Sequence, residues 1–345
     1  MKDSMRDLVR KNIQNLAPYS SAREEYTGKQ GVFLDANENP YGNYNRYPDP
    51  NQTDLKNRIA ELKGVNPNQI FLGNGSDEVI DLAFRIFCEP NKDKALTFTP
   101  TYGMYEVSAN INAVELIKLP LDNSFQIDRK ALEPFFADPD LKLIFLCSPN
   151  NPTGNIMKTA DIEYLLRNFN GILILDEAYI DFCSQASFSE KLSSYPNLIV
   201  SQTLSKAWGL AGVRLGIAFM SNEILSYYKK VKPPYNISAV NQQVALDALN
   251  KETEYRQNVV TILNEKEKLI QALQSFRIVR KIYPSDANFL LVEVDDADDL
   301  YSKLVNQQII IRNRNSVVKN AVRITVGSSA ENKKLLNALQ NITNG

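Results

Sequence analysis

Short apolar runs bounded by turn residues recur through the first two thirds of this 345-residue chain, and they constrain its fold more than any other feature. These runs are residues 70–72, 95–98, 143–147, 172–175, 198–201 and 215–220. Their length and flanking residues are typical of buried strands. Segments with helical spacing lie between several of them; in residues 76–87, for example, Val79, Ala83 and Phe87 fall on one helix face. Strands that alternate with helices predict an open, mostly parallel sheet, which binds ligands at the carboxyl ends of its strands.

The residue pattern of the sequence changes after Pro233 and Pro234. A long charged stretch with helical character is expected at residues 238–276. It is followed by short strands, expected at residues 289–294 and 321–326, and by two further helices, expected at residues 296–307 and 330–342. A chain of this length is too long for one compact core, so two domains are expected. We predict an α/β fold with a large domain over residues 30–237 and a smaller α+β domain formed by residues 1–29 and 238–345.

Composition excludes several classes of protein. With 39 basic and 40 acidic residues, the chain has no charge excess that would attract nucleic acid or an anionic membrane. Its apolar runs are too short to span a bilayer, and its N-terminus is unlike a signal peptide. We therefore expect a cytoplasmic protein without a nucleic-acid or membrane partner. Three widely separated cysteines, Cys88, Cys147 and Cys183, fit reduced thiols in that compartment.

The chain contains no histidine. This excludes Ser-His-Asp and Cys-His nucleophilic systems as well as histidine metal sites, and we expect no metal centre. Any proton transfer must use lysine, tyrosine, aspartate or glutamate.

A lone lysine, Lys206, stands among small hydroxyl residues in the stretch 201–216, with Arg214 eight positions further on. A lysine becomes a nucleophile when burial beside another cation lowers its pKa, and it can then hold a carbonyl cofactor as a Schiff base. Thr203, Ser205 and Arg214 would bind a phosphate group on that cofactor. The alternative is a surface loop with one solvated lysine.

Residues 73–78, with the sequence Gly-Asn-Gly-Ser-Asp-Glu, follow an expected strand and open an expected helix. Free backbone N–H groups and the positive end of the helix dipole would face a bound anion there, which favours a phosphate site at Gly75 and Ser76. The alternative is that Ser76 only caps the helix. Both interpretations can hold together.

Three further motifs follow expected strands. Asn151, before a proline, can direct its amide toward a ligand oxygen, although an ordinary Asn-Pro turn is the alternative. Asp176 ends a buried strand and would need a cationic partner, such as a protonated pyridine nitrogen, while Tyr179 could donate to the phenolic oxygen of the same ring. A strand-end carboxylate in solvent is the alternative for Asp176. Tyr102 could lie flat on a cofactor ring or simply pack against its neighbours.

The order of these motifs is similar to that of the fold type I pyridoxal-phosphate enzymes, and the resemblance covers about residues 37–327. Within that group, residues 34–41, 46–48 and 322–327 most resemble the histidinol-phosphate aminotransferase family. The resemblance implies a large domain with a mostly parallel seven-stranded sheet flanked by helices, a cytoplasmic enzyme of histidine biosynthesis and a homodimer with shared active sites. It also implies transfer of an amino group between L-histidinol phosphate and 2-oxoglutarate, which becomes glutamate.

The same resemblance implies roles for single residues. Lys206 would bind pyridoxal 5'-phosphate covalently, Asp176 would pair with the pyridine nitrogen, Asn151 and Tyr179 would contact the phenolic oxygen, and Tyr102 would stack on the ring. The cofactor phosphate would be held by Gly75, Ser76, Thr203, Ser205 and Arg214. The substrate anion would be bound by Arg312 and Arg323, helped by Tyr19, Asn37 and a Tyr47 that reaches across a dimer interface.

Several alternatives stay open at this point. Arg314 lies close to Arg312 in sequence and could take its place. An aminotransferase for aromatic amino acids or a relative of threonine-phosphate decarboxylase would share the cofactor residues. A cofactor-binding regulator without turnover is the non-enzyme alternative, against which the presence of Lys206, Asp176 and the late arginines argues.

Overall fold

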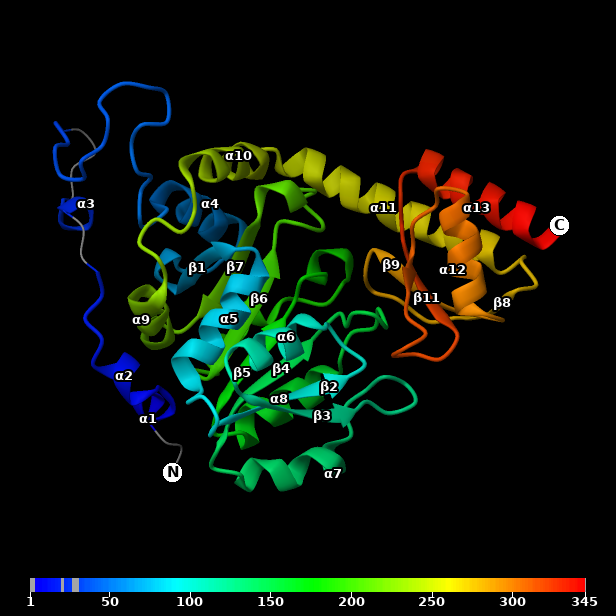
Figure 1. Cartoon of the computed structure of the whole chain (residues 1–345), viewed down its shortest axis with the longest axis horizontal. Helices are drawn as coiled ribbons and strands as arrows, with labels where there is room; N and C mark the ends of the chain where they lie inside the picture. The colour runs from blue at the N-terminus through cyan, green and yellow to red at the C-terminus, as the bar shows by residue number, and fades with distance from the viewer. Residues whose placement is uncertain (1–3, 20–21, 27–30, 345) are drawn as a thin grey trace.

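The computed structural model describes residues 4–19, 22–26 and 31–344. Its main feature is a seven-stranded sheet with the strand order β1-β7-β6-β5-β4-β2-β3 (Figure 1). The strands are β1 (Ile70–Asn74), β2 (Lys94–Thr99), β3 (Glu115–Pro120), β4 (Leu141–Cys147), β5 (Ile172–Asp176), β6 (Leu198–Thr203) and β7 (Leu215–Met220). Only β7 runs against its neighbours β1 and β6, so the predicted mostly parallel sheet is confirmed. The carboxyl ends of β1, β2, β4, β5 and β6 consequently meet at one edge.

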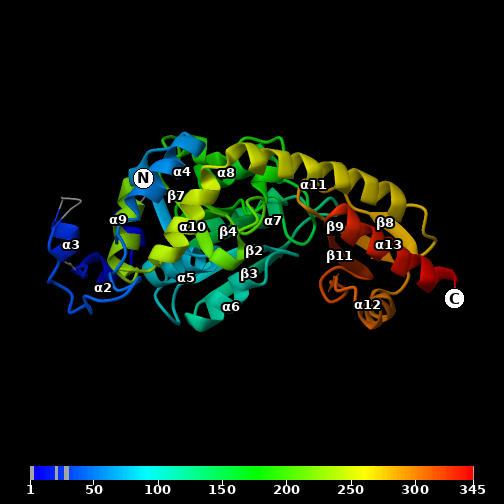
Figure 2. The same cartoon turned by 90° about the horizontal axis from the view of Figure 1, so that it is seen from above.

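Successive side chains of the central strands enter two separate cores. In β5, Ile172 and Ile174 face one side while Leu173 and Leu175 face the other, as the period of two along a strand requires. Helices cover both faces of the sheet, as the view from above shows (Figure 2). The core that contains Ile172 and Ile174 also includes residues of the helices α5 (Ser76–Phe87), α6 (Met104–Ile111) and α9 (Asn222–Val231). The core that contains Leu173 and Leu175 includes residues of α4 (Thr53–Lys63), α7 (Arg129–Leu132), α8 (Thr159–Asn168) and α10 (Ala239–Leu249).

A smaller four-stranded sheet follows, with the strand order β10-β11-β9-β8 and antiparallel pairing throughout. Its strands are β8 (Val279–Ile282), β9 (Phe289–Val294), β10 (Arg312–Asn313) and β11 (Ala321–Thr325). Residues from α11 (Glu252–Leu273), α12 (Ala297–Asn306) and α13 (Ser329–Asn344) share one core with this sheet. Helix α11 runs from α10, beside the large sheet, to the small sheet (Figure 1). The long charged stretch therefore forms two helices, with the break at residues 250–251.

The N-terminal segment begins with α1 (Met5–Leu8) and α2 (Lys11–Gln14). Leu8, Val9 and Ile13 are buried in the core that contains α5 and α9, and the Arg10 N–H donates to the Ile86 carbonyl at 3.0 Å. These contacts join residues 8–13 to the large sheet, whereas we expected residues 1–29 to join the smaller domain. Short apolar positions can pack on any exposed apolar face, which is why the sequence did not identify the partner. Residues 1–3, 20–21, 27–29 and 345 of that assignment lie outside the described residues.

The chain then passes through α3 (Ala22–Glu25) and an arm over residues 31–47. Glu38 anchors this arm, because its carboxylate accepts hydrogen bonds from Arg23 at 2.5 Å, from Arg46 at 2.7 Å and from the Tyr47 N–H at 2.6 Å. Apolar side chains of the arm, including Val32 and Leu34, are nonetheless almost fully exposed. None of the helices in the described ranges combines the length and apolar character needed to cross a bilayer. The domain boundary near residue 237 stays a prediction.

Candidate active site

A cavity of about 620 Å³ opens where the carboxyl ends of the large sheet face β10 and β11. Every residue that the sequence predicted to bind the cofactor lines it, together with both predicted substrate arginines. They are Gly75, Ser76, Tyr102, Asn151, Asp176, Tyr179, Thr203, Ser205, Lys206, Arg214, Arg312 and Arg323. Arg314 also lines this cavity. Side chains that are far apart in sequence thus converge on one space, as expected for the edge where parallel strands end.

Lys206 lies in the turn that follows β6, and its side chain lines the cavity while staying accessible to solvent. Burial lowers the pKa of its amine, and the positive charge of Arg323 lowers it further. The amine nitrogen lies 5.8 Å from the centre of the Tyr179 ring. A lysine whose pKa is lowered in a cavity is suited to attack a carbonyl group. The position in the cavity, with Arg323 close enough to lower the pKa of the amine, favours this role over that of a solvated surface lysine.

Asp176, the last residue of β5, is 3% exposed, so the alternative of a solvated strand-end carboxylate is wrong. Its Oδ2 accepts a hydrogen bond from the Tyr105 hydroxyl at 2.8 Å, and its Oδ1 accepts one from the Ala178 N–H at 3.1 Å. Burial raises the pKa of the carboxyl to about 6, although the Tyr105 hydrogen bond acts in the opposite direction. In the described part of the chain, no cationic side chain forms an ion pair with this carboxylate. A ring nitrogen that carries a proton would supply the missing partner.

Asn151 connects the two sides of the cavity. Its Oδ1 accepts a hydrogen bond from Arg323 at 2.5 Å, and its Nδ2 lies 3.5 Å from the Tyr179 hydroxyl. Tyr179 packs edge-on against Phe289 of β9, with 5.0 Å between the ring centres. Tyr102 donates from its hydroxyl to Asp77 at 3.0 Å. The amide and the two phenols therefore surround the cavity in front of Asp176.

The start of α5 has the features of a phosphate site. Gly75 caps the helix with φ 73° and ψ 171°, a conformation that is nearly exclusive to glycine. A Cβ at Gly75 would lie 2.7 Å from Arg214 Nη2, so the absence of a side chain is what lets the guanidinium approach the helix. The nearest carboxylate to that guanidinium is Asp77, at a loose 3.7 Å. The Thr203 and Ser205 hydroxyls, 3.0 Å apart, complete a donor set that fits a phosphate group.

Three predicted substrate residues do not line the cavity of their own chain. Tyr19 is 70% exposed, and Asn37 is exposed on the arm with φ 55°. Tyr47 stacks on Tyr235, with ring centres 4.5 Å apart and planes at 14°. Because these residues do not line the cavity that contains Lys206, their predicted role requires a second subunit and stays a prediction.

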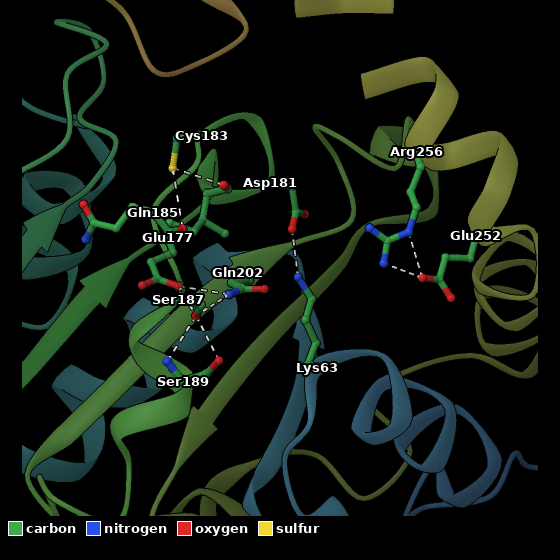
Figure 3. A network of polar contacts seen from close by, with 11 residues as sticks. Lys63, Glu177, Asp181, Cys183, Gln185, Ser187, Ser189, Gln202, Glu252 and Arg256 are labelled. Atoms are coloured by element: carbon green, nitrogen blue, oxygen red, sulfur yellow. Dashed lines mark hydrogen bonds and ion pairs between the residues drawn. The ribbon is translucent and has the colours of Figure 1, made fainter. Parts of the chain in front are cut away.

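A second buried polar network is centred on Glu177, the residue that follows Asp176 in the sequence (Figure 3). Glu177 is 2% exposed and accepts hydrogen bonds from Ser187 at 2.5 Å, from Gln202 at 3.0 Å and from the Phe188 N–H at 2.9 Å. Burial raises its pKa to about 7. This network fixes the loop that follows Asp176 to β6, the strand that leads into the turn of Lys206. Sequence analysis missed both Glu177 and Tyr105, because neither has a local pattern that distinguishes it from an ordinary polar or core residue.

A larger cavity of about 1060 Å³ shares Lys206, Arg312 and Arg323 with the first. Its other walls include Trp208 and Tyr255, which stack at 3.8 Å with their planes at 5°. The residues with cofactor chemistry line the smaller cavity, and the larger one extends from Lys206 along α11. Lys206 therefore lies between the two spaces.

Comparison with known proteins agrees with this geometry. Residues 27–339 match the family model described as aminotransferase class I and II. The chain belongs to this family. It is therefore a pyridoxal-phosphate-dependent transaminase, and the predicted family and fold class are confirmed.

Among its relatives in this family, the histidinol-phosphate aminotransferase of Parabacteroides distasonis is 53% identical over 345 residues, which cover 99% of each chain. The solved structure of the histidinol-phosphate aminotransferase from Clostridium acetobutylicum is 25% identical, with a TM-score of 0.80 over 88% of this chain and 92% of that one. The enzyme of the same name from Sinorhizobium meliloti, solved in complex with pyridoxal-5'-phosphate, is 23% identical. It has a TM-score of 0.80 over 87% of this chain and 83% of the other.

Proposed function

We propose that this transaminase transfers the amino group of L-histidinol phosphate to 2-oxoglutarate, in histidine biosynthesis. The observation that carries the proposal is the pair Arg312 and Arg323, which lie directly opposite each other on β10 and β11 and line the cavity of Lys206. The 53% identity to a histidinol-phosphate aminotransferase supports the choice of amine. Arg312 and Arg323 form no ion pair with an acidic side chain in the described ranges, so both guanidiniums are available to a substrate anion.

Pyridoxal phosphate fits the residues of the smaller cavity. Thr203, Ser205 and Arg214, with Gly75 and Ser76 at the start of α5, would hold its phosphate. Tyr102 would stack on its ring, and Asn151 and Tyr179 would contact its phenolic oxygen. Asp176 would keep the ring nitrogen protonated. When bound, the cofactor supplies the electron sink that makes a proton on the substrate carbon acidic enough to be removed.

Lys206 would first hold the cofactor and then act as the general base. The lowered pKa of its amine increases the neutral fraction that can accept a proton. After the substrate amine has taken its place, the Lys206 nitrogen would remove the proton from the carbon that bears the substrate nitrogen and would pass it to the cofactor rather than back to that carbon. Asp176 stays fixed meanwhile by the Tyr105 and Ala178 hydrogen bonds.

Arg312 and Arg323 would serve both half-reactions. Histidinol phosphate carries a phosphate and no α-carboxylate, whereas 2-oxoglutarate and glutamate carry two carboxylates. A planar guanidinium can bind either anion through paired N–H groups. The hydrogen bond from Arg323 to Asn151 couples the anion end of the cavity to the cofactor end.

The proposal includes a cytoplasmic homodimer. The exposed apolar side chains of the arm, Val32 and Leu34, favour burial against another copy of the chain. A second subunit would also bring Tyr19, Asn37 and Tyr47 to a cavity that they do not reach in their own chain.

An absorbance titration tests the proposal. Histidinol phosphate should remove the cofactor band of the purified enzyme, and 2-oxoglutarate should restore it. Lys206→Ala should abolish both changes as well as turnover. Loss of the band with aromatic amino acids alone would instead identify an aromatic aminotransferase. Release of carbon dioxide from threonine phosphate would identify a decarboxylase, such as the Porphyromonas gingivalis enzyme whose fold is similar at a TM-score of 0.74.

A further inference from the structure

The hairpin formed by β10 and β11 places three arginines on one face. Arg312 lies opposite Arg323, and Asn313 lies opposite Val322. The Arg314 N–H donates to the Ala321 carbonyl at 2.9 Å, so the pairing continues two residues past Arg312. Because side chains alternate along a strand, Arg312, Arg314 and Arg323 share one face while Asn313 and Val322 take the other.

The surroundings of the hairpin agree with this alternation. Val322 is buried in the core of the small sheet, and Asn313 reaches Asp298 of α12 at 2.5 Å. The opposite face, with its three arginines, looks into the cavity of Lys206, and all three line that cavity. Three guanidiniums therefore meet at the end of the cavity that is formed by the small sheet.

These arginines are unusual in having no acidic partner. Within the described ranges, none of the three forms an ion pair with a carboxylate. By contrast, Arg280 on β8 of the same sheet pairs with Asp295. Arg323 donates to the neutral Asn151, and Arg314 Nε is buried without any hydrogen-bond partner. A buried donor without a partner costs free energy, and such a group is retained where a ligand satisfies it.

We propose that Arg314 is a specificity-determining residue, which together with Arg312 and Arg323 forms a site for a phosphate dianion and favours a phosphomonoester over a carboxylate. This inference rests on the proposed function and deepens it. A carboxylate has two oxygens and one charge, which two guanidiniums satisfy. A phosphomonoester has three terminal oxygens and close to two charges at neutral pH, so it can use the donors of a third.

Electrostatics at Arg314 support the assignment. Burial lowers the pKa of its guanidinium, and the like charges of Arg323 and Arg312 add to that effect. Three cations held close together repel one another, and a dianion relieves more of this repulsion than a monoanion does. The third arginine therefore selects for charge as well as for geometry.

The test compares Arg314→Gln with wild type in the full-length holoenzyme. Lys319→Gln is the matched control, because Lys319 lies in the same hairpin, is exposed and lines neither cavity. The substrates are L-histidinol phosphate, L-histidinol and glutamate. We expect Arg314→Gln to lower kcat/KM for histidinol phosphate by roughly ten- to hundredfold, the effect of one charge-assisted hydrogen bond. For histidinol and glutamate the change should be less than about threefold, because neither supplies a phosphate oxygen to the third guanidinium. Lys319→Gln should leave all three values unchanged.

Equal losses with all three substrates, or no loss with histidinol phosphate, would overturn the role of Arg314. A binding readout covers the case in which the variant folds poorly. Inorganic phosphate should inhibit the wild-type enzyme competitively. It should inhibit the conservative variant Arg314→Lys less strongly, because lysine keeps the charge but loses the paired N–H donors of arginine. Equal inhibition of the two enzymes would contradict the proposal. Wild-type turnover of histidinol phosphate separately decides the proposed function. If wild type uses another amine, phosphate inhibition against that amine still measures the site.

Discussion

The hydroxyl of Tyr105 donates a 2.8 Å hydrogen bond to Oδ2 of Asp176, and both side chains are almost completely buried. Tyr105 also packs edge-on against Tyr102, with 5.7 Å between ring centres, and stacks on Phe145. One core residue of α6 thus touches both the carboxylate proposed to face the cofactor nitrogen and the ring proposed to stack on it. We expect Tyr105 to position both groups.

Tyr105→Phe removes only the hydroxyl. Asp176 then loses one of its two hydrogen bonds, which makes its charged form less favourable and its pairing with a protonated ring nitrogen weaker. We expect the dissociation constant of pyridoxal phosphate to rise by roughly ten- to hundredfold, from the loss of one hydrogen bond to a charged group. Spectrophotometric titration of cofactor-free protein measures it.

Tyr228→Phe is the control for this change. Tyr228 is equally buried, and its hydroxyl donates to the Val79 carbonyl at 3.0 Å, remote from the cavity. Both variants should lose similar stability, about 1 kcal/mol. Only Tyr105→Phe should bind the cofactor more weakly, and equal cofactor affinity in the two variants would show that Tyr105 only fills the core.

Glu177 predicts a pH dependence of stability. Its pKa of about 7 in the folded protein lies above the ordinary 4.5, because of burial. Protonation therefore stabilises the folded state; this stabilisation is complete below pH 4.5 and is lost as the pH rises through 7. Relative to Glu177→Gln, the wild-type free energy of unfolding should fall by about 1–3 kcal/mol over that range. Chemical denaturation at several pH values measures the difference.

The exposed Glu190 belongs to the same part of the chain, and Glu190→Gln serves as the control. Its unfolding free energy should follow that of wild type at every pH. A constant difference between wild type and Glu177→Gln from pH 4.5 to 8 would mean that Glu177 stays ionised throughout, held by its three hydrogen-bond donors.

Gly75→Ala tests the phosphate site. An alanine there takes up a backbone conformation that only glycine adopts easily, and its Cβ would press on Arg214 at 2.7 Å. Gly64→Ala provides a comparison, because Gly64 also has a positive φ of 65° but has nothing within 4 Å of the added Cβ. Both variants should lose about 1 kcal/mol of stability or more. Only Gly75→Ala should also weaken cofactor binding, by at least about tenfold, as expected for a displaced charge-assisted contact.

The sequence predicted the elements and residues that have a local signature. Continuous apolar runs marked six strands of the large sheet, but β3 was missed because this edge strand has only exposed and partly buried residues and no continuous apolar run. Asp176 was recognised because it directly follows such a run, and Lys206 because it stands among small hydroxyl residues with an arginine eight positions further on. Arg312 and Arg314 could not be distinguished, since only the register of the hairpin shows that both share the face of Arg323. Partners brought together from distant segments, such as Tyr105 and Asp176, depend on tertiary packing that no local pattern encodes.

Arg323→Ala should raise KM for both substrates. Arg323 is partly buried, lies over the Phe289 ring at 5.3 Å and donates to Asn151, so its loss removes an anion contact and also frees the Asn151 amide. We expect an increase of roughly ten- to hundredfold for histidinol phosphate and for glutamate alike, from the loss of a charge-assisted contact. Steady-state kinetics with each substrate measure it. Unchanged KM values for both substrates would exclude Arg323 from the anion site.

Tyr47 allows a test of the shared active site. In its own chain it stacks on Tyr235 and lines neither cavity, so a role in catalysis requires delivery to a second subunit. Tyr47→Phe keeps the stacking and removes the hydroxyl, and Lys206→Ala removes the base; each variant alone should be strongly impaired. In a mixed dimer, one site receives both altered residues and the other receives neither. Unfolding and refolding an equal mixture should therefore restore about a quarter of wild-type activity, since about half of the dimers are mixed and each has one intact site. If Tyr47 instead served the site of its own chain, every site in the mixture would lack either the hydroxyl or the lysine, and the activity would stay at the mean of the two variants.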